Sequence, residues 1–485
     1  MTAAPPAAAD HAPFLERLFS RLPEERSYPI AASEGEVPRW LAGTYYVNGP
    51  ARFARGEVAY RHWLDGDGMV CALAFEDGRV RFANRFVRSR KWTDEEAAGR
   101  ALYRTFGTTF PGDRLVRDLA LASPVNVSVY PVAGKLLAFG EQGLPWELDP
   151  ATLATVGEHT FGGRLNAISP FSAHPHVDRA TGETFNFGVS FAASRPLVHL
   201  YRFDPEGGLL YRRRLDLDLP RSVHDFGLSA RHAVLYLSPY LLDMEAFVAG
   251  GRTVLDCLAW RPERGSRLLV ARRDDGEKVA EVEIGDRYCL HLINAFEEEG
   301  DGGGERLVVD VVELEEPVYP DYLGLPDLFV DVAPGQPVRR VIDLATGEVV
   351  EERRLDGLRA CDFPSLHPAS PQHPYDDFWL LAIGATGRRG RKFFDELVHL
   401  RWSAGGVAGA WRTPRGVYLG GEPVVAADAG DPRRAVVIVQ ELDPEHDRAA
   451  FLLFDAFDVE RGPIARLPLE EPIPPLFHAC WAPAG

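Results

Sequence analysis

The chain has 485 residues, of which 46% are apolar and 26% charged, the composition of a globular protein with material for a large core. Its net charge of −18 argues against nucleic-acid binding and gives no attraction to anionic lipid. The five cysteines are scattered and form no Cys-x-x-Cys pair, which argues against a disulfide framework and favours a reducing cytoplasm.

Residues 1–39 predict a tail followed by a short helix. The opening MTAAPPAAADHAP lacks the basic and apolar regions of a signal peptide, so we expect a cytoplasmic protein. In residues 13–22, five apolar side chains fall on one helical face: Phe14, Leu15, Leu18, Phe19 and Leu22. We expect this face to pack on the main body, with contact between Phe14–Leu22 and a membrane surface as the alternative.

From Trp40 onward the pattern is one of strands and turns, which predicts an all-β domain over residues 40–485. The strongest strand candidates are rich in Val, Leu, Phe and Tyr and are bounded by Gly, Pro and Asp. They are Arg79–Val87, Lys135–Phe139, His232–Leu237, Leu307–Leu314, Phe378–Ile383, Ala435–Val439 and Ala450–Phe454.

A weak repeat of strand, polar turn and strand recurs along this domain, mostly every 50 to 60 residues or so. It occurs at residues 72–82, 146–157, 201–211, 258–270, 341–350, 400–411 and 452–462. Seven such hairpins predict a seven-bladed β-propeller in which each hairpin is the outer part of a blade. The alternative is that any large β protein contains hairpins of this kind.

Four of the 14 histidines occupy equivalent places in this repeat. His174, His224 and His291 precede the third, fourth and fifth hairpins, and His478 follows the seventh. Because the innermost strand of a propeller blade lines the axis and precedes the outer strands, we expect these imidazoles to meet near the axis. Neutral imidazoles suit Fe, Cu, Ni and Zn.

Three acidic residues hold the corresponding places in other blades: Glu141, Asp362 and Glu422. A histidine that binds a metal usually donates its other N–H to a carboxylate or a carbonyl, so these residues are candidates for that role. His176 competes with His174 because it lies two residues away.

Six segments in order then resemble the carotenoid cleavage oxygenases, a family of non-haem iron enzymes. GTYYVNGPARF (43–53) and HWLDGDGM (62–69) resemble the N-terminal signature of the family. AHPHVDRATGE (173–183), VHDFGLS (223–229), HLINAFEEE (291–299) and FHACWAP (477–483) resemble its four iron-histidine segments. The chain departs from the family pattern at Asp362, where Glu is usual, at His176, where Lys is common, and at Ala479, where Gly is usual.

The resemblance implies a seven-bladed propeller with Fe(II) on its axis, held by His174, His224, His291 and His478. It also implies a cap of short helices and loops over the iron end, and Glu141, Asp362 and Glu422 as partners of the histidines. The implied reaction inserts both atoms of O2 across a C=C bond and releases two carbonyl products.

The implied substrate is an apolar conjugated molecule, an apocarotenoid or a carotenoid, held in a tunnel. The tunnel candidates are Val125, Tyr103, Phe106, Gly140, Trp146, Phe171, Tyr240 and Phe394. Stilbene-cleaving members tend to carry Lys at the position of Gly140, so glycine favours a carotenoid-type substrate and could widen the tunnel. Cleavage of a stilbenoid or phenylpropenoid remains an alternative, as does a propeller that binds a partner without chemistry.

The stretch Tyr240–Val248 is also apolar, in a loop or short helix. Together with Phe14–Leu22 it suggests an apolar patch that takes carotenoids from a membrane surface.

Overall fold

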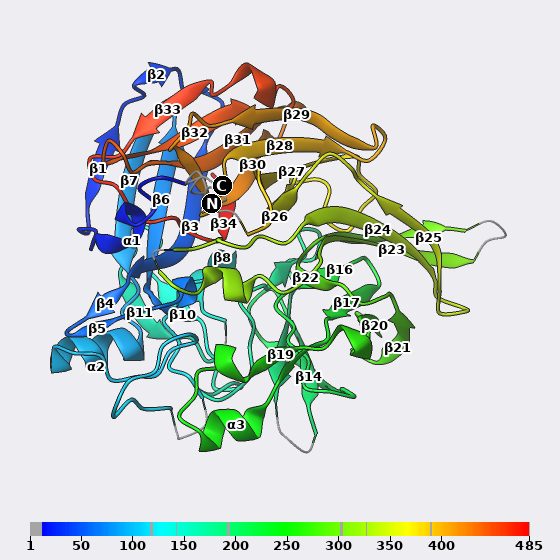
Figure 1. Cartoon of the computed structure of the whole chain (residues 1–485). Coiled ribbons are helices and arrows are strands. Elements are labelled where there is room, and N and C mark those ends of the chain that lie inside the picture. The colour runs from blue at the N-terminus through cyan, green and yellow to red at the C-terminus, as the bar shows by residue number, and fades with distance from the viewer. Residues whose placement is uncertain are drawn as a thin grey trace, which may run out of the picture.

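Seven antiparallel sheets follow one another along the chain in the computed structural model, and together they form a ring (Figure 1). The structure describes residues 12–116, 120–141, 143–191, 195–300, 304–325, 327–388 and 390–484. The colours of Figure 1 pass once around the ring from blue through green to red, so each sheet is one blade of a propeller. The predicted seven-bladed β-propeller is confirmed.

The blades are numbered I to VII in chain order and described from the axis outward. Blade I contains β34 (Ala479–Pro483), β3 (Gly43–Arg52), β6 (Asp67–Glu76), β7 (Arg79–Phe86) and β1 (Ser27–Ile30). Blade II contains β8 (Ser128–Val132), β9 (Lys135–Phe139), β10 (Trp146–Leu148) and β11 (Thr155–Glu158). Blade III contains β12 (His176–Val177), β13 (Thr184–Ser190), β14 (Leu197–Phe203) and β15 (Leu209–Asp216).

Blade IV contains β16 (Phe226–Leu228), β17 (His232–Leu237), β20 (Arg267–Arg272) and β21 (Lys278–Glu283). Blade V contains β22 (Tyr288–Glu299), β23 (Glu305–Leu314), β24 (Gly335–Asp343) and β25 (Glu348–Arg354). Blade VI contains β26 (Ala360–Leu366), β27 (Asp377–Ile383), β28 (Glu396–Arg401) and β29 (Gly406–Arg412). Blade VII contains β30 (Tyr418–Asp428), β31 (Asp431–Asp443), β32 (Arg448–Asp455), β33 (Ala465–Pro468) and β2 (Glu34–Gly35).

The two ends of the chain close the ring. The C-terminal β34 is the innermost strand of blade I, where it pairs with β3 in antiparallel register from Val47–Ala479 to Gly43–Pro483. The N-terminal segment adds β1 to the outer edge of blade I and β2 to the outer edge of blade VII. These two short strands, which lie before residue 40, satisfy backbone groups at two blade edges.

Most of the predicted hairpins form the outer part of a blade, but the seventh and the fourth differ. Residues 452–462 cover only the end of β32 and a 3-10 turn at Val459–Arg461, before β33 begins. Residues 258–270 belong to β19 (Leu258–Trp260), a 3-10 turn at Pro262–Arg264 and β20. β19 pairs with β18 (Tyr240–Leu242) in a separate two-stranded sheet, and the outer hairpin of blade IV is β20–β21. A second small sheet joins β4 (Ala54–Arg55) and β5 (Val58–Ala59).

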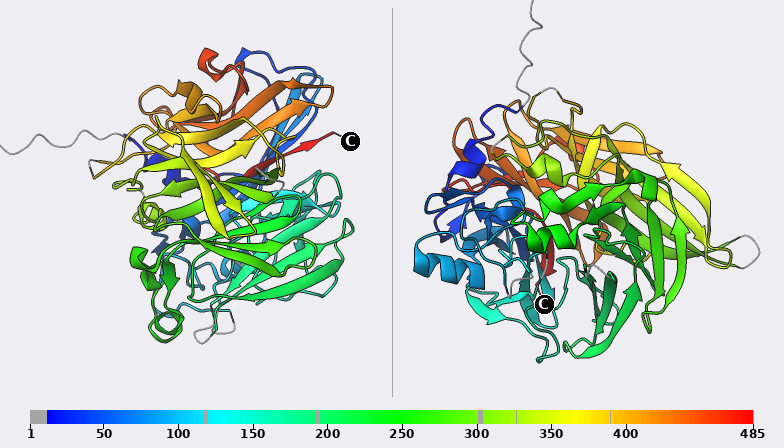
Figure 2. Two further views of the ribbon diagram at one scale, coloured as in Figure 1. Left: turned by 90° about the vertical axis from the view of Figure 1, so that its right-hand side faces the viewer. Right: turned by 60° about the horizontal axis from the view of Figure 1, so that its bottom comes forward.

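In the part of the chain that the structure describes, helical structure is confined to short pieces before and between the strands. The α-helices are α1 (Arg17–Ser20), α2 (Arg90–Ala98) and α3 (Met244–Ala249), and the 3-10 turns are η1 (Trp63–Asp65), η2 (Leu255–Cys257), η3 (Pro262–Arg264), η4 (Tyr319–Tyr322) and η5 (Val459–Arg461). The left view of Figure 2 places α3 on one face of the ring, with the C-terminal end of β34 toward the other. No helix among the described residues is long and apolar enough to cross a membrane.

The predicted helix over residues 13–22 is shorter than expected. Phe14 has a positive φ of 62°, so a regular helix does not begin at Pro13, and α1 has only four residues. Leu15, Leu18 and Phe19 are buried, with Phe19 edge-on to Trp63, whereas Leu22 is 53% exposed. The expected packing of this face on the main body is therefore observed for three of its side chains.

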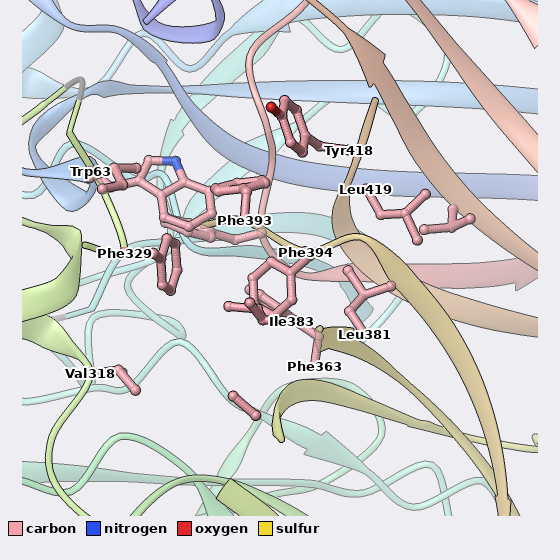
Figure 3. Close-up of a cluster of buried hydrophobic side chains, with 14 of the residues drawn as sticks. Trp63, Val318, Phe329, Phe363, Leu381, Ile383, Phe393, Phe394, Tyr418 and Leu419 are labelled. Atoms are coloured by element: carbon pink, nitrogen blue, oxygen red, sulfur yellow. The ribbon is translucent and has the colours of Figure 1, made fainter. Parts of the chain in front are cut away.

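Long connections at the histidine end of the ring pack on one another and form the cap. The N–H of Leu255 donates to the carbonyl of Phe106, and the buried His62 donates from Nε2 to the carbonyl of Tyr319 at 2.8 Å. Trp63 packs beneath the cap against Phe393 and Phe329, in the aromatic cluster of Figure 3. These contacts fix the cap relative to the blades.

Candidate metal centre and its pocket

The four predicted histidines meet at the axis. His174, His224 and His478 lie one or two residues before β12, β16 and β34, and His291 is within β22. Because each of these strands is the innermost of its blade, their starts lie together at one end of the ring. All four imidazoles are buried, with exposed fractions of 3–7%.

The Nε2 atoms of the four side chains face a common point. His174 Nε2 lies 2.9 Å from His224 Nε2, and His291 Nε2 lies 3.1 Å from His478 Nε2. One nitrogen of each ring lies within 4.8 Å of those of the other three. Such close nitrogens repel as lone pairs unless a proton or a cation lies between them, so the group fits a metal site.

Three of the imidazoles contact the predicted carboxylates through Nδ1. His224 Nδ1 is 2.8–2.9 Å from the two oxygens of Glu141, and His478 Nδ1 is 3.1 Å from Glu422. His291 Nδ1 is 2.5 Å from Asp362 Oδ1. These acceptors favour the tautomer with the proton on Nδ1, which leaves Nε2 free to bind a cation.

Glu141 reaches its histidine from an unexpected strand. Glu422 and Asp362 are on the innermost strands β30 and β26, as expected, but Glu141 follows β9, the second strand of blade II. In an antiparallel pair, the end of the second strand lies beside the start of the first. Glu141 therefore arrives at the same end of the ring as the histidines.

Irregular backbone turns several of these side chains toward the axis. The register between β22 and β23 shifts between Cys289 and Leu292, on either side of His291. It also shifts after Asp362 in β26 and between Gly420 and Val424 in β30. A bulge re-aims a side chain that the regular alternation would send elsewhere.

His174 is the member of the group without a close carboxylate. Asp225 Oδ1 lies 3.7 Å from His174 Nδ1, beyond hydrogen-bonding distance. Asp225 is buried, with 7% of its surface exposed, and sequence reasoning did not select it, although it follows His224 directly in VHDF.

Burial and neighbouring charges shift the pKa values of three of the imidazoles in different directions. Burial, reinforced by the other histidines, lowers the pKa of His174 and of His478 well below the usual value, so both stay neutral. Burial acts in the same direction on His291, but the Asp362 carboxylate outweighs it and the pKa of His291 is raised. Burial also raises the pKa of Glu422 to about 8.

His176 does not join the group. Its Nε2 is 2.8 Å from the carbonyl of Phe226, and its ring stands edge-on to that of Phe226 at 4.7 Å. His176 therefore does not compete with His174 for a place in the group in this structure, because its ring contacts Phe226 of the neighbouring blade. Ala479, the departure beside His478, donates its N–H to Glu422 at 3.2 Å.

An apolar pocket of about 140 Å³ lies beside the histidines. Glu141 and Tyr319 line it and also contact His224, which defines its inner end, and the Tyr319 hydroxyl is 3.4 Å from His224 Nδ1. Aliphatic and aromatic side chains form most of its walls. The aromatic ones are Phe106, Phe171, Phe187, Phe191, Phe247 and Tyr319.

Two of the eight tunnel candidates, Phe106 and Phe171, line this pocket. The other six lie elsewhere, each with a local partner. Tyr103 donates its hydroxyl to Asp94, Trp146 stands in β10, Tyr240 packs on Tyr288, and Phe394 packs on Phe363 in the cluster of Figure 3. Aromatic character alone does not distinguish a residue that lines the pocket from a core residue. The sequence therefore offers more tunnel candidates than line this pocket.

Val125 and Gly140 form a tight contact behind the pocket. Val125 is fully buried with a positive φ of 54°, and its carbonyl accepts a hydrogen bond from Asn48 Nδ2 at 3.0 Å. A Cβ at Gly140 would lie 2.0 Å from Ser123 Oγ and 3.3 Å from Val125 Cα. Gly140 therefore allows the 123–125 segment to approach closely, and its expected widening of the tunnel stays a prediction.

A second cluster of one histidine and two carboxylates lies at the opposite end of the blades. His232 Nδ1 is 3.0 Å from Glu297 and 3.7 Å from Glu305, beside a pocket of about 940 Å³. Glu297 also accepts hydrogen bonds from Ser229 Oγ and from the N–H of Arg231. This carboxylate thus anchors the turn between β16 and β17.

Comparison with known proteins identifies the family. Residues 19–483 match the family described as retinal pigment epithelial membrane protein. The chain is a member of the carotenoid cleavage oxygenase family.

Individual relatives cover almost the whole chain. It is 30% identical to the apocarotenoid-15,15'-oxygenase of Synechocystis over 96% of this chain and 95% of that protein. It is 26% identical to the isoeugenol monooxygenase of Pseudomonas nitroreducens over 93% of this chain and 94% of that protein. A solved structure of a Synechocystis ACO variant superimposes with a TM-score of 0.88 at 27% identity and covers 98% of this chain and 100% of that one.

Proposed function

We propose that this protein is an Fe(II)-dependent dioxygenase that cleaves a C=C bond of an apocarotenoid or a carotenoid and gives two carbonyl products. The observation that carries the proposal is the convergence of four buried Nε2 atoms at the inner end of an apolar pocket.

The donor set suits iron. Four neutral imidazoles leave the positive charge of a bound cation uncompensated, and soft thiolate ligands are absent from the group. Four protein ligands would close a tetrahedral zinc site, which argues against a zinc hydrolase. When bound, Fe(II) would supply the activation of O2 next to the alkene.

The side chains around the histidines hold and shield the site. Glu141, Asp362 and Glu422 fix the orientation of three imidazoles by accepting their Nδ1 protons. Burial of all four rings keeps bulk water from the metal and lowers the local dielectric.

The pocket supports an elongated apolar substrate. Phe106, Phe171 and Phe187 present ring faces and edges that complement a conjugated chain. Gly140 supplies no side chain that would bind a phenol, and the Synechocystis relative is named for its action on apocarotenoids.

One observation favours a second candidate, cleavage of a phenylpropenoid or stilbenoid. The Tyr319 hydroxyl lies at the inner end of the pocket, 3.4 Å from His224 Nδ1, where it would meet a polar group on a substrate. The pocket volume of about 140 Å³ also suits a compact molecule.

A direct assay separates the two candidates. The iron-loaded protein is incubated under O2 with an apocarotenal, a carotene, isoeugenol or resveratrol, and the carbonyl products are identified by mass spectrometry. The proposal expects retinal-type aldehydes from the carotenoid substrates. Vanillin-type products alone would establish the second candidate, and no product from any of them would contradict both.

We also propose peripheral contact with a membrane surface, through α3 and the exposed Leu22. Leu15, Leu18 and Phe19 are buried, so the expected N-terminal contribution reduces to Leu22. Val248 of α3 is 45% exposed and Phe247 behind it lines the pocket, which connects this surface to the substrate path. Val248→Ser should reduce co-sedimentation with neutral vesicles, and unchanged co-sedimentation would contradict the proposal.

A further inference from the structure

We propose that Asp225 is a positioning residue of the metal centre: it holds the segment that presents His291, and its negative charge faces Nδ1 of His174. This inference rests on the proposed function, because it assigns a role relative to the metal that the four histidines would bind.

Asp225 contacts the segments of three ligands. It follows His224 directly in the chain and lies between that ligand and β16. Its Oδ2 accepts the N–H of Leu292, the residue after His291, at 2.8 Å. Its Oδ1 lies 3.7 Å from His174 Nδ1 and accepts the N–H of Phe226 at 2.7 Å.

The contact with Leu292 stabilises the bulge that turns His291 inward. The ladder between β22 and β23 is interrupted between Cys289 and Leu292, so backbone groups there need acceptors outside the sheet. Asp225 provides one from blade IV, in a site where only 7% of its surface is exposed. A buried N–H left without an acceptor in this position would destabilise the bulge.

Asp225 also faces His174, the member of the group without a carboxylate in hydrogen-bonding distance. If Nε2 of His174 faces the metal, its proton is on Nδ1, and Asp225 is the only carboxylate within 4 Å among the described residues. A carboxylate at that position orients the ring and increases the basicity of its Nε2.

The test compares metal binding by Asp225→Asn with that of a matched control, Glu297→Gln. Glu297 also joins blades IV and V through β22, by hydrogen bonds to the 229–231 turn, but it lies at the opposite end of the blades. Apparent affinities for Fe(II) and for Co(II) are measured by anaerobic competition with a chelator. Thermal unfolding of the metal-free and metal-loaded forms is recorded in parallel.

We expect Asp225→Asn to weaken metal binding by about 10- to 100-fold and to reduce the rise in Tm on metal loading. Glu297→Gln should lower the Tm of both forms equally and leave the affinity unchanged. In a His174→Ala background, Asp225→Asn should weaken binding less than in the wild type, because one of its two roles is already lost.

An affinity of Asp225→Asn within twofold of the wild type would overturn the inference, as would an equal loss in Glu297→Gln. Asp225→Glu, which retains the charge, should recover part of the affinity; if both Asp225 variants fail to fold, the role is structural and the inference is wrong. A wild-type protein that binds neither metal contradicts the proposed function itself, so the two failures are distinguishable.

Discussion

Asp362 Oδ1 lies 2.5 Å from Nδ1 of His291, although its side chain is one methylene shorter than the glutamate usual in the family. The shorter side chain reaches its partner directly because β26 is irregular from Asp362 to Ser365, and the following Phe363 has a positive φ of 56°. Phe363 in turn packs against His291 and His478, at ring distances of 5.5 and 5.3 Å. The backbone brings Asp362 close to the axis.

Asp362→Glu should therefore destabilise the protein. Asp362 is 4% exposed and already in contact with His291, so an added methylene has no free volume to fill. We expect a loss of about 1–3 kcal/mol in the free energy of unfolding of the metal-free protein, measured in urea. Asp286→Glu, at a site 68% exposed, is the control. If Asp362→Glu is as stable as the wild type, the site has room for the added methylene and this prediction is wrong.

The backbone near Val125 predicts an ordered series of glycine variants. A Cβ at Gly68 would lie 2.0 Å from the carbonyl oxygen of Val125, which cannot rotate away. We expect Gly68→Ala to cost about 2–4 kcal/mol in unfolding free energy, and Gly140→Ala about 1–2 kcal/mol, because Ser123 Oγ can move.

The cost of Gly140→Ala should fall when Ser123→Ala is added. Gly304, whose Cβ would meet nothing within 4 Å, is the control for both glycine variants. If the Gly68→Ala protein is as stable as Gly304→Ala, the backbone of Val125 does not approach Gly68 as closely as described.

Asp321 predicts a pH dependence of stability. Burial, together with Glu316 and Asp331, raises the pKa of this carboxyl to about 8 in the folded state, against the usual 3.8. Between about pH 4 and pH 8, the folded state therefore holds a proton that the unfolded state has released. Because of this proton, stability falls as the pH rises through this range. Above about pH 8 the contribution of Asp321 to stability no longer changes.

Asp321→Asn removes that titration. When the pH rises from 5 to 8.5, the unfolding free energy of the wild type should fall by more than that of this variant. Asp327→Asn, at an exposed site in the same connection, should behave as the wild type does. Identical pH profiles of Asp321→Asn and the wild type would rule out the raised pKa.

Filling the pocket should block cleavage without loss of metal. Val189 in β13 lines the pocket and is 8% exposed, so Val189→Trp places an indole in the substrate path. We expect kcat/KM for an apocarotenal to fall about tenfold or more while metal content is retained. Val407→Trp, on the outer strand β29 where Val407 is 41% exposed, should leave both unchanged. Undiminished cleavage by Val189→Trp would place the substrate elsewhere.

The fold was predictable because each blade repeats the same apolar strands and polar turns. Lys135–Phe139 and His232–Leu237 coincide with β9 and β17, because short runs rich in Val, Leu and Phe favour strands. The convergence of the four histidines followed from their places beside innermost strands. The N-terminal helix was overestimated because the positive φ of Phe14 has no signature in the hydrophobic pattern.

The pocket and the carboxylate that faces His174 were not predictable in the same way. Residues that line the pocket, such as Phe191 and Val254, lie in connections between strands. The sequence of these connections has no regular period, so their apolar residues cannot be told from those of the core. Asp225 acts across a blade boundary on Leu292, a contact that depends on the bulge in β22. A role as metal ligand for the four histidines stays a prediction until a metal is measured.

Metal analysis of the anaerobically purified protein tests this prediction most directly. We expect iron in a ratio near one per chain in the wild type and its loss in His224→Ala, whose imidazole lies 2.9 Å from that of His174. Glu297→Gln, remote from the four histidines, should retain the iron. Zinc in place of iron, or no metal in the wild type, would contradict the oxygenase account.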